Sequence, residues 1–304
     1  MKLAMLFTGQ GAQFPGMGKD LADRFEVARE LFAEADEVLG EPLSKVCYEG
    51  PESDLARTEV TQPATLAVSV AAQRALSLTP DLAAGHSLGE YSALCVAGTL
   101  QFADAISLVR DRARRMQVAV PEGEGGMVVL RKMPLDEVES LVARVDAGVC
   151  EIANYNSPGQ YVVSGAKKAM DQVIELAGPR KAMRLPVSVP FHCSMLRDAA
   201  AEFAAVLDNV EFRDPSFPIY CNVDAVPVTT GDAARDALKR QFSGAVRWEA
   251  SVRRILTEGV RRFVECGPKA PLLKMVVQIA NADGVEGVEI YPATTADEID
   301  SLRS

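Results

Sequence analysis

Apolar runs of strand length alternate with longer helical patterns over residues 1–120. Residues 2–7 are mostly apolar and lead to a glycine, and residues 82–84 form a second apolar run, so both are predicted as buried strands. Helix-forming composition predicts helices at residues 20–38, 63–76, 88–97 and 101–118. Strands that alternate with helices in this way favour a parallel sheet covered by helices.

A different pattern follows the glycine-rich stretch 121–126, which suits a linker. Strand-like and helical segments then come in the order β-α-β-β-α-β of ferredoxin-like domains, with a turn at Asn156-Ser157-Pro158-Gly159 between the central strands. These segments are predicted at residues 127–131, 135–145, 149–154, 161–164, 166–177 and 182–187.

Beyond residue 190 the alternation of helices and strands resumes. Strands are predicted at residues 218–222 and 262–266, and helices at 232–242, 249–257 and 271–279. The sequence therefore predicts a split α/β core, residues 1–124 and 191–304, with a ferredoxin-like subdomain inserted at residues 125–190.

Composition narrows the class of protein. Of the 304 residues 48% are hydrophobic, and no apolar run reaches the roughly 18 residues of a transmembrane helix, so no membrane partner is expected. The net charge of −10 argues against nucleic acid as a partner. Six scattered cysteines without a C-x-x-C pair, and no paired histidines, exclude the usual zinc spacings, so no metal is expected. Unpaired thiols are typical of the cytoplasm, which is the predicted location.

The segment Gly85-His86-Ser87-Leu88-Gly89 fits the G-x-S-x-G pattern of a nucleophile elbow, in which a serine sits on a tight strand-to-helix turn. Glycines two residues before and after Ser87 favour this interpretation, because side chains there would clash in a sharp turn. Ser87 and Glu90 also spell a capping box, so a serine that merely caps a helix remains an alternative.

A serine nucleophile needs an adjacent base, most often an imidazole, and the chain has two histidines. His86 is a weak candidate, because neighbouring residues at an elbow project in different directions. If Ser87 is a nucleophile with an imidazole base, that base is His192. Cys193 beside it is a poor alternative nucleophile, since sequence neighbours rarely form such a pair.

Two further segments carry candidate chemistry. Gly9-Gln10-Gly11 follows the first strand and fails the phosphate-binding patterns, so it is either an ordinary turn or the source of a second oxyanion-hole amide beside that of Leu88. In the arginine-rich helix 101–118, Arg112 lies at the edge of the apolar stripe, where it can reach a buried anion. The neighbouring arginines, Arg110, Arg114 and Arg115, are predicted to point away from that stripe, on a largely solvated face.

Together these motifs resemble those of the malonyl-CoA:acyl carrier protein transacylases. The resemblance spans nearly the whole chain and implies an α/β-hydrolase-like core with an inserted ferredoxin-like subdomain. The motifs that carry it are Gly9-Gln10-Gly11, residues 85–90, Arg112 before Met116-Gln117, residues 156–160 and 186–193, Arg240-Gln241 and Gly267-Pro268.

The resemblance also implies a role for each site residue. Ser87 and His192 would form a dyad without an acidic third member, and the main-chain carbonyl of Gln241 would orient the histidine. The remaining implied assignments are Arg112 for the malonyl carboxylate and the amides of Gln10 and Leu88 for the oxyanion hole.

The implied reaction moves a malonyl group from malonyl-CoA to the phosphopantetheine thiol of acyl carrier protein, for fatty acid biosynthesis, without a metal or redox cofactor. Other functions remain open: loading of polyketide synthase carriers, charging of the malonate decarboxylase carrier, hydrolysis of acyl carriers, and non-catalytic carrier binding. Arg112 argues against a hydrolase of uncharged acyl groups, and the intact dyad argues against a non-catalytic module.

Overall fold

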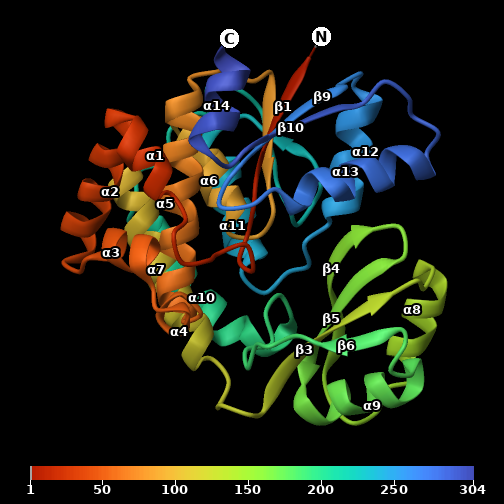
Figure 1. The fold of residues 1–304 in the computed structure, drawn as a ribbon. Coiled ribbons are helices and arrows are strands. Elements are labelled where there is room, and N and C mark those ends of the chain that lie inside the picture. The colour runs from red at the N-terminus through yellow and green to blue at the C-terminus, as the bar shows by residue number, and fades with distance from the viewer. Residues whose placement is uncertain (1) are drawn as a thin grey trace.

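The computed structural model describes residues 2–304 and contains two β-sheets (Figure 1). The larger sheet has six strands in the order β10-β9-β1-β2-β7-β8, and every neighbouring pair is parallel except β7 and β8. The predicted α/β core with a parallel sheet is therefore confirmed. Its strands are β1 (Leu3–Phe7), β2 (Leu82–Gly85), β7 (Ile219–Tyr220), β8 (Pro227–Val228), β9 (Arg262–Cys266) and β10 (Glu289–Ala293).

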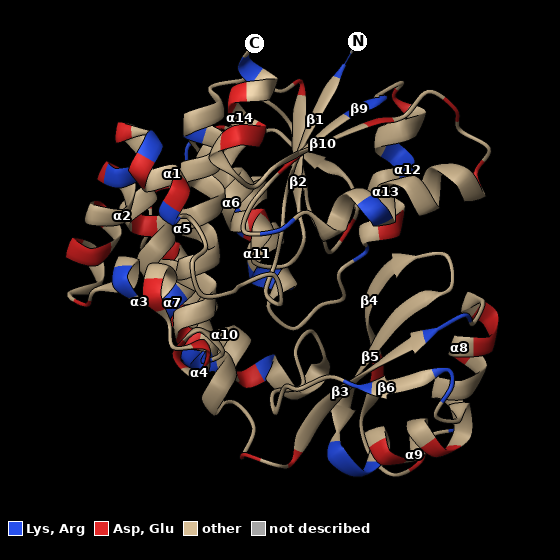
Figure 2. Cartoon of the chain, in the orientation of Figure 1, with Lys and Arg blue, Asp and Glu red and all other residues tan. Residues whose placement is uncertain are grey.

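Helices cover both faces of this sheet, because successive side chains of a buried strand point to opposite faces. On β1, Met5 and Phe7 pack toward α2 (Glu26–Leu39), α5 (Thr58–Leu76) and α7 (Phe102–Val118), whereas Ala4 and Leu6 pack toward α12 (Trp248–Thr257) and α13 (Pro271–Ala282). Figure 2 shows charged residues of both signs on the surrounding helices. The core helices are α1 (Lys19–Arg24), α2 (Glu26–Leu39), α3 (Leu43–Glu49), α4 (Glu52–Leu55), α5 (Thr58–Leu76), α6 (Gly89–Val96), α7 (Phe102–Val118), α10 (Arg197–Asp208), α11 (Gly231–Gln241), α12 (Trp248–Thr257), α13 (Pro271–Ala282) and α14 (Ala296–Arg303).

The smaller sheet has four antiparallel strands in the order β4-β5-β3-β6. This order, together with the β-α-β-β-α-β chain order, is that of a ferredoxin-like unit, so the predicted fold of the subdomain is confirmed. The domain boundaries at residues 125 and 190 stay a prediction. The elements are β3 (Gly125–Arg131), α8 (Leu135–Ala143), β4 (Cys150–Ser157), β5 (Gln160–Ala166), α9 (Lys167–Ala177) and β6 (Ala182–Arg184).

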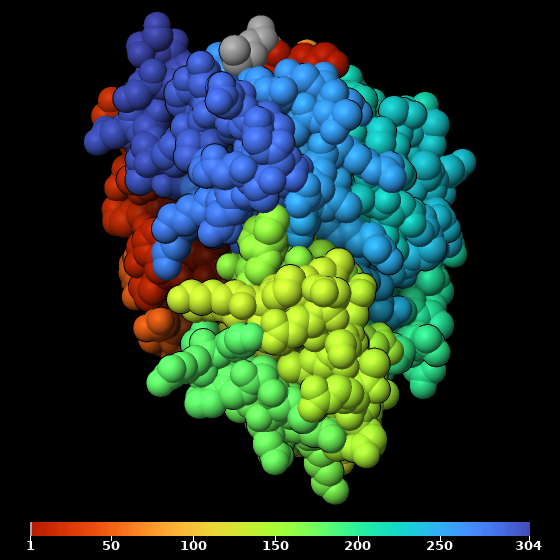
Figure 3. Space-filling model, turned by 90° about the vertical axis from the view of Figure 1, so that its right-hand side faces the viewer, coloured from red at the N-terminus to blue at the C-terminus, as the bar shows by residue number. Residues whose placement is uncertain are grey.

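Strand β4 joins the smaller sheet to the core. The amide of Tyr155 donates to the Val246 carbonyl at 2.9 Å, and the Val246 amide donates to the Ala153 carbonyl at 2.8 Å. Ser157 adds a side-chain hydrogen bond to Gln278 of α13 at 2.9 Å. Figure 3 shows the smaller unit, in yellow and green, packed below the C-terminal part of the core in blue.

Several predicted elements differ from the structure. The helix predicted at residues 20–38 is two helices, because Phe25 between them is extended (φ −117°, ψ 122°). The helix predicted from Pro63 begins at Thr58, so Pro63 lies inside it. Residues 125 and 126 of the predicted linker belong to β3 instead, where a Cβ at Gly125 would lie 2.4 Å from Pro190 Cδ. The elements without a counterpart in the prediction are α3, α4, α10, α14, β8, β10 and a 3₁₀ turn at Ser194–Leu196.

Parallel pairing brings several loops to one edge of the core sheet. Phe7 at the end of β1 lies beside Gly85 at the end of β2, and β7 pairs with the other side of β2. The loops after these three strands carry Gln10, Ser87 and Asn222. Ligands of open α/β sheets bind at the carboxyl ends of the strands, so a functional site is expected at this edge. None of the helices within residues 2–304 has the length and apolar composition that a bilayer span requires.

Candidate active site

A tight turn between β2 and α6 holds Ser87. Its φ of 52° lies in the left-handed region, which costs a non-glycine residue about 1–3 kcal/mol. The flanking glycines allow this turn: a Cβ at Gly85 would lie 1.9 Å from the Gly89 carbonyl oxygen, and one at Gly89 would lie 2.0 Å from the Phe7 carbonyl oxygen. The segment therefore has the strand–turn–helix geometry of a nucleophile elbow.

The hydroxyl of Ser87 faces His192. Ser87 Oγ lies 2.6 Å from His192 Nε2, and the histidine side chain is buried in the loop that precedes α10. Ser87 does not cap α6, because Leu88 is the N-cap residue and no side chain accepts a hydrogen bond there. The capping interpretation is therefore wrong, and the hydroxyl lies within reach of an imidazole nitrogen.

Two main-chain carbonyls hold the other side of the imidazole. His192 Nδ1 lies 3.1 Å from the Gln241 carbonyl oxygen and 3.0 Å from that of Gly244. A carbonyl can only accept, so Nδ1 carries the proton and the Nε2 lone pair faces Ser87. Among the described residues no carboxylate hydrogen-bonds to His192. Gln241 was anticipated from the sequence, whereas Gly244 was not.

Desolvation sets the protonation state of both histidines. Burial, with Arg112 and then His86 nearby, lowers the pKa of His192 to about 3, so its ring is neutral near pH 7 and can accept a proton. His86 is turned toward other partners: its Nε2 lies 2.9 Å from Asn156 Oδ1, and its ring packs against Trp248 with centroids 5.8 Å apart. Burial also lowers the pKa of His86.

Arg112 lies beside the dyad and is 1% exposed. It donates to Gln62 Oε1 at 2.9 Å, to Gln241 Oε1 at 3.0 Å and to Ser87 Oγ at 3.1 Å, and its guanidinium carbon lies 5.4 Å from the centre of the Tyr91 ring. Its Nε has no protein partner within residues 2–304. All three hydrogen-bond acceptors are neutral, so a carboxylate is the charged partner that this guanidinium lacks.

The other arginines of α7 differ in their exposure to solvent. Arg114 is exposed and Arg115 is partly exposed, in line with a solvated face. Arg110 was expected to point into solvent, but its side chain is only 8% exposed and forms an ion pair of 2.7 Å with Glu41. The helix therefore buries two arginines, of which Arg112 alone contacts Ser87.

Two main-chain amides near the elbow remain available as donors. Within residues 2–304, neither the Leu88 nor the Gln10 amide donates to a protein acceptor, whereas the Ser87 amide is taken by Asn222 Oδ1 at 2.6 Å. The loop that carries Gln10 lies against the elbow, since a Cβ at Gly9 would lie 2.6 Å from the His86 carbonyl oxygen. Their role in an oxyanion hole stays a prediction.

Comparison with known proteins gives the family. The family model described as "Acyl transferase domain" matches residues 4–303. The chain belongs to this family. It is 40% identical over 286 residues, 91% of this chain and 90% of its relative, to the malonyl CoA-acyl carrier protein transacylase of Bacillus subtilis.

Two solved structures are similar to this acyl transferase over almost its entire length. One is an acyl carrier protein S-malonyltransferase from Vibrio cholerae, with a TM-score of 0.94, 39% identity, and coverage of 99% of this chain and 100% of that one. The other is a malonyl-transacylase in complex with a type II PKS acyl-carrier protein, also with a TM-score of 0.94, 39% identity and 99% coverage of both chains.

Besides Gly244, three residues of the site were not assigned from the sequence: Asn222, Glu90 and Gln62. Asn222 holds the elbow, because its Oδ1 accepts from the Ser87 amide and its Nδ2 donates to the Gly85 carbonyl at 2.7 Å. Glu90 accepts from the Asn222 amide at 2.9 Å and is buried beneath the site. Glu90 had a local signal, as part of the apparent capping box, but the other two act through contacts between distant segments.

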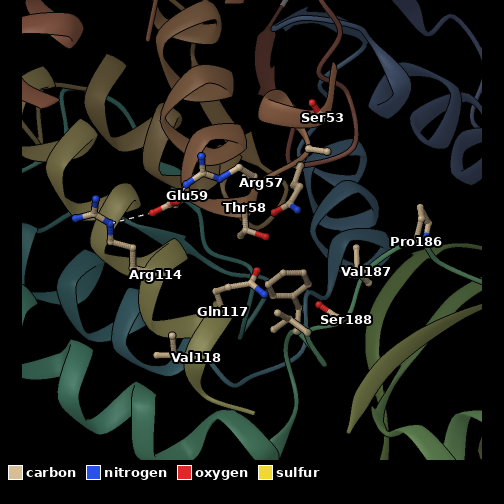
Figure 4. Close-up of a pocket in the computed structure, with 14 residues that line it drawn as sticks. Ser53, Arg57, Thr58, Glu59, Arg114, Gln117, Val118, Pro186, Val187 and Ser188 are labelled. Carbon is tan, nitrogen blue, oxygen red and sulfur yellow. Dashed lines mark hydrogen bonds and ion pairs between the residues drawn. The ribbon is translucent and has the colours of Figure 1, made fainter. Parts of the chain in front are cut away.

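An open cavity of about 560 Å³ lies beside the dyad. Figure 4 shows Thr58 and Gln117 facing it from α5 and α7, with Val187 and Ser188 opposite. Gln10 and Phe191, the neighbour of His192, also line it, so the cavity adjoins the loops that carry Gln10 and His192. No group of three or more His, Cys, Asp and Glu side chains in the described part of the chain could hold a metal ion.

Proposed function

We propose that this acyl transferase moves a malonyl group from malonyl-CoA to the phosphopantetheine thiol of acyl carrier protein, for fatty acid synthesis. The observation that carries the proposal is the buried guanidinium of Arg112, 3.1 Å from Ser87 Oγ and bonded only to neutral acceptors. An acyl group with its own carboxylate supplies the missing charge and places its thioester carbon near the hydroxyl. The relatives named for this activity support the same substrate.

The first half-reaction transfers the malonyl group from coenzyme A to Ser87. Ser87 Oγ attacks the thioester carbon and gives its proton to His192 Nε2, while the Leu88 and Gln10 amides hold the oxyanion. The carbon–sulfur bond then breaks, and the coenzyme A thiolate takes the proton from His192. A neutral orienting group, the Gln241 carbonyl, suffices because thioesters are activated acyl donors.

The second half-reaction transfers the malonyl group from Ser87 to the carrier protein. The carrier's thiol gives its proton to His192 Nε2 and attacks the ester carbon. The bond between that carbon and Ser87 Oγ breaks, and the serine oxygen takes the proton back. Each half-reaction returns His192 to its neutral state, and the two together return Ser87 to its free hydroxyl, so no cofactor is consumed.

The carrier of a polyketide pathway is the second candidate acceptor. One similar structure is a malonyl-transacylase in complex with a type II PKS acyl-carrier protein, at 39% identity to this chain. The chemistry at Ser87 is the same for either carrier. Rates of malonyl transfer to a fatty-acid carrier and to a polyketide carrier distinguish the two, and a faster polyketide rate would overturn the preferred assignment.

We further propose that the protein works in the cytoplasm. All six cysteines are free thiols, five of them buried. Free thiols are typical of reducing compartments.

The malonyl ester on Ser87 is directly testable. Intact mass after mixing with malonyl-CoA should show one malonyl adduct in the wild type and none in Ser87→Ala. Ser92→Ala is the matched control, because Ser92 is a buried serine of α6, the helix that follows Ser87, and its hydroxyl has no partner in the described structure. An adduct that persists in Ser87→Ala would refute the assignment.

A further inference from the structure

A buried carboxylate, Glu90 of α6, lies behind the candidate site and is 1% exposed. Its Oε2 accepts from the Asn222 amide at 2.9 Å and from Gln241 Nε2 at 3.0 Å. Burial raises the pKa of Glu90 to about 7, against the smaller opposing effects of these two hydrogen bonds and of Arg112 and Arg240. A change of charge nearby therefore changes its protonation near neutral pH.

The side-chain amide of Gln241 connects Glu90 to Arg112. Its Nε2 donates to Glu90 Oε2 and its Oε1 accepts from Arg112 Nη2 at 3.0 Å. This orientation is fixed, because a guanidinium can only donate and an ionised carboxylate can only accept. Among the described residues Arg112 hydrogen-bonds to no carboxylate, so Glu90 is the acid joined to it through one amide.

The other titratable groups around Glu90 keep a fixed charge. Burial raises the pKa of Tyr91 on the same helix and of Cys221 after β7, so both stay neutral. Arg240 of α11 has ion pairs of its own with two aspartates, at 2.7 and 2.9 Å. His192, whose pKa is lowered to about 3, is neutral near pH 7 in the free protein. Of these groups around Arg112, Glu90 is thus the one that can change charge near pH 7.

We infer that Glu90 takes up a proton when the malonyl carboxylate binds to Arg112. In the free protein the ionised Glu90 balances the guanidinium. The substrate carboxylate brings a second negative charge into the same desolvated region, and neighbouring carboxylates disfavour each other's ionisation. The proton comes from solvent and ends on Glu90, and a neutral acyl group has no such effect. The inference rests on the proposed malonyl transfer.

Proton uptake can be measured while the Ser87 ester forms. The exchange of thioester for ester consumes no net proton, and the released thiol ionises only at higher pH, since even a free cysteine thiol has a pKa of about 8.5. With a pH indicator in weak buffer, the wild type should take up a fraction of a proton per ester that grows from about pH 6 to about pH 8. Glu90→Gln keeps an acceptor for Asn222 and Gln241 and should show only the release from the thiol.

A control variant and an alternative measurement accompany this test. Glu265→Gln is the matched control: Glu265 is also fully buried, but it lies under α13, where it accepts from the Leu273 amide at 3.0 Å, so its variant should keep the uptake. If Glu90→Gln does not fold, infrared difference spectra of the wild type replace it. Malonylation should then convert a carboxylate band into that of a protonated carboxylic acid, and acetylation should not.

The outcomes separate the two proposals. Absence of the ester by intact mass would refute the proposed function. An ester that forms with equal proton uptake in the wild type and in Glu90→Gln would place the proton on another group, such as His192, and would overturn the role of Glu90 alone. Malonylation that yields no protonated carboxylic acid in the infrared spectrum would likewise overturn the role of Glu90.

Discussion

At the scale of single residues, two residues of the site each make contacts of two kinds. The main-chain carbonyl of Gln241 contacts His192 Nδ1, while its side chain bridges Arg112, Glu90 and the Ser87 carbonyl, the last at 2.8 Å. Asn222 likewise holds both the Ser87 amide and the preceding turn. The strained elbow is thus fixed on both sides by amides from other segments of the chain.

Arg112→Ala should reduce malonyl transfer far more than acetyl transfer. Without the guanidinium the malonyl carboxylate is buried and unpaired, which costs about 3–5 kcal/mol, or a factor of about 10² to 10³ or more in rate. The measurement is kcat/KM for malonyl-CoA and acetyl-CoA. Arg115→Ala, on the same helix but outside the site, should leave the ratio of the two donors unchanged. Equal losses for both donors in Arg112→Ala would mean that the arginine only supports the structure.

Gln241→Ala should be milder than His192→Ala but not silent. The carbonyl that orients His192 survives, so the loss of a general base, roughly 10² to 10⁴ in rate, is avoided. The missing amide leaves Arg112 and Glu90 without their shared partner, and each unsatisfied buried group costs about 1–3 kcal/mol. Acylation rates from rapid-mixing mass spectrometry compare the two variants. A loss in Gln241→Ala as large as that in His192→Ala would assign the side chain a direct catalytic role.

At the scale of elements, the site depends on how closely β1, β2 and α6 approach one another. Gly85 and Gly89 have no room for a side chain, because backbone atoms of the elbow and of β1 occupy the space. The start of α6 therefore packs directly against the end of β1. This contact places the Leu88 amide beside the loop that carries Gln10.

Gly89→Ala should disrupt the elbow. The new Cβ would lie 2.0 Å from the Phe7 carbonyl oxygen, so β1 and α6 must separate, at a cost of at least the roughly 1–3 kcal/mol of an overpacked core. Gly98→Ala is the control: its φ of 76° is strained for alanine, but nothing lies within 4 Å of the new Cβ. Urea unfolding and ester formation measure both effects. The idea fails if Gly89→Ala forms the ester as fast as Gly98→Ala.

At the scale of the whole molecule, the sequence predicts those features that have a local signal. The elbow glycines, the scarce histidines and the two strand patterns are each visible within a short segment of the sequence. Both sheets and the Ser87–His192 contact are predicted from these local signals. Asn222 and Gly244 could not be predicted, because their roles arise where distant segments meet. The break at Phe25 and the early start of α5 before Pro63 likewise depend on tertiary packing, which overrides local propensity.

Buried acids give the molecule a characteristic dependence of stability on pH. Burial raises the pKa of Glu265 to about 8 and that of Glu90 to about 7, from an ordinary value of 4.5. Between the ordinary and the raised value the folded state binds more protons than the unfolded state, so stability falls as pH rises. Burial lowers the pKa of His192 from 6.5 to about 3, which acts oppositely, so that stability falls as pH drops below 6.5.

Glu265 should therefore make the largest contribution to the slope between about pH 7 and pH 8, because Glu90 is already about half deprotonated at pH 7 and His192 has completed its titration. Glu265 alone should lower the free energy of unfolding of the wild type there by up to about 1.4 kcal/mol per pH unit. Glu265→Gln should remove most of this decline, whereas Glu90→Gln should flatten the curve mainly below about pH 7. Urea titrations over this range measure the slopes. A Glu265→Gln curve parallel to the wild type would show that Glu265 is already ionised in the folded protein, despite its buried Oε1 having no partner within residues 2–304.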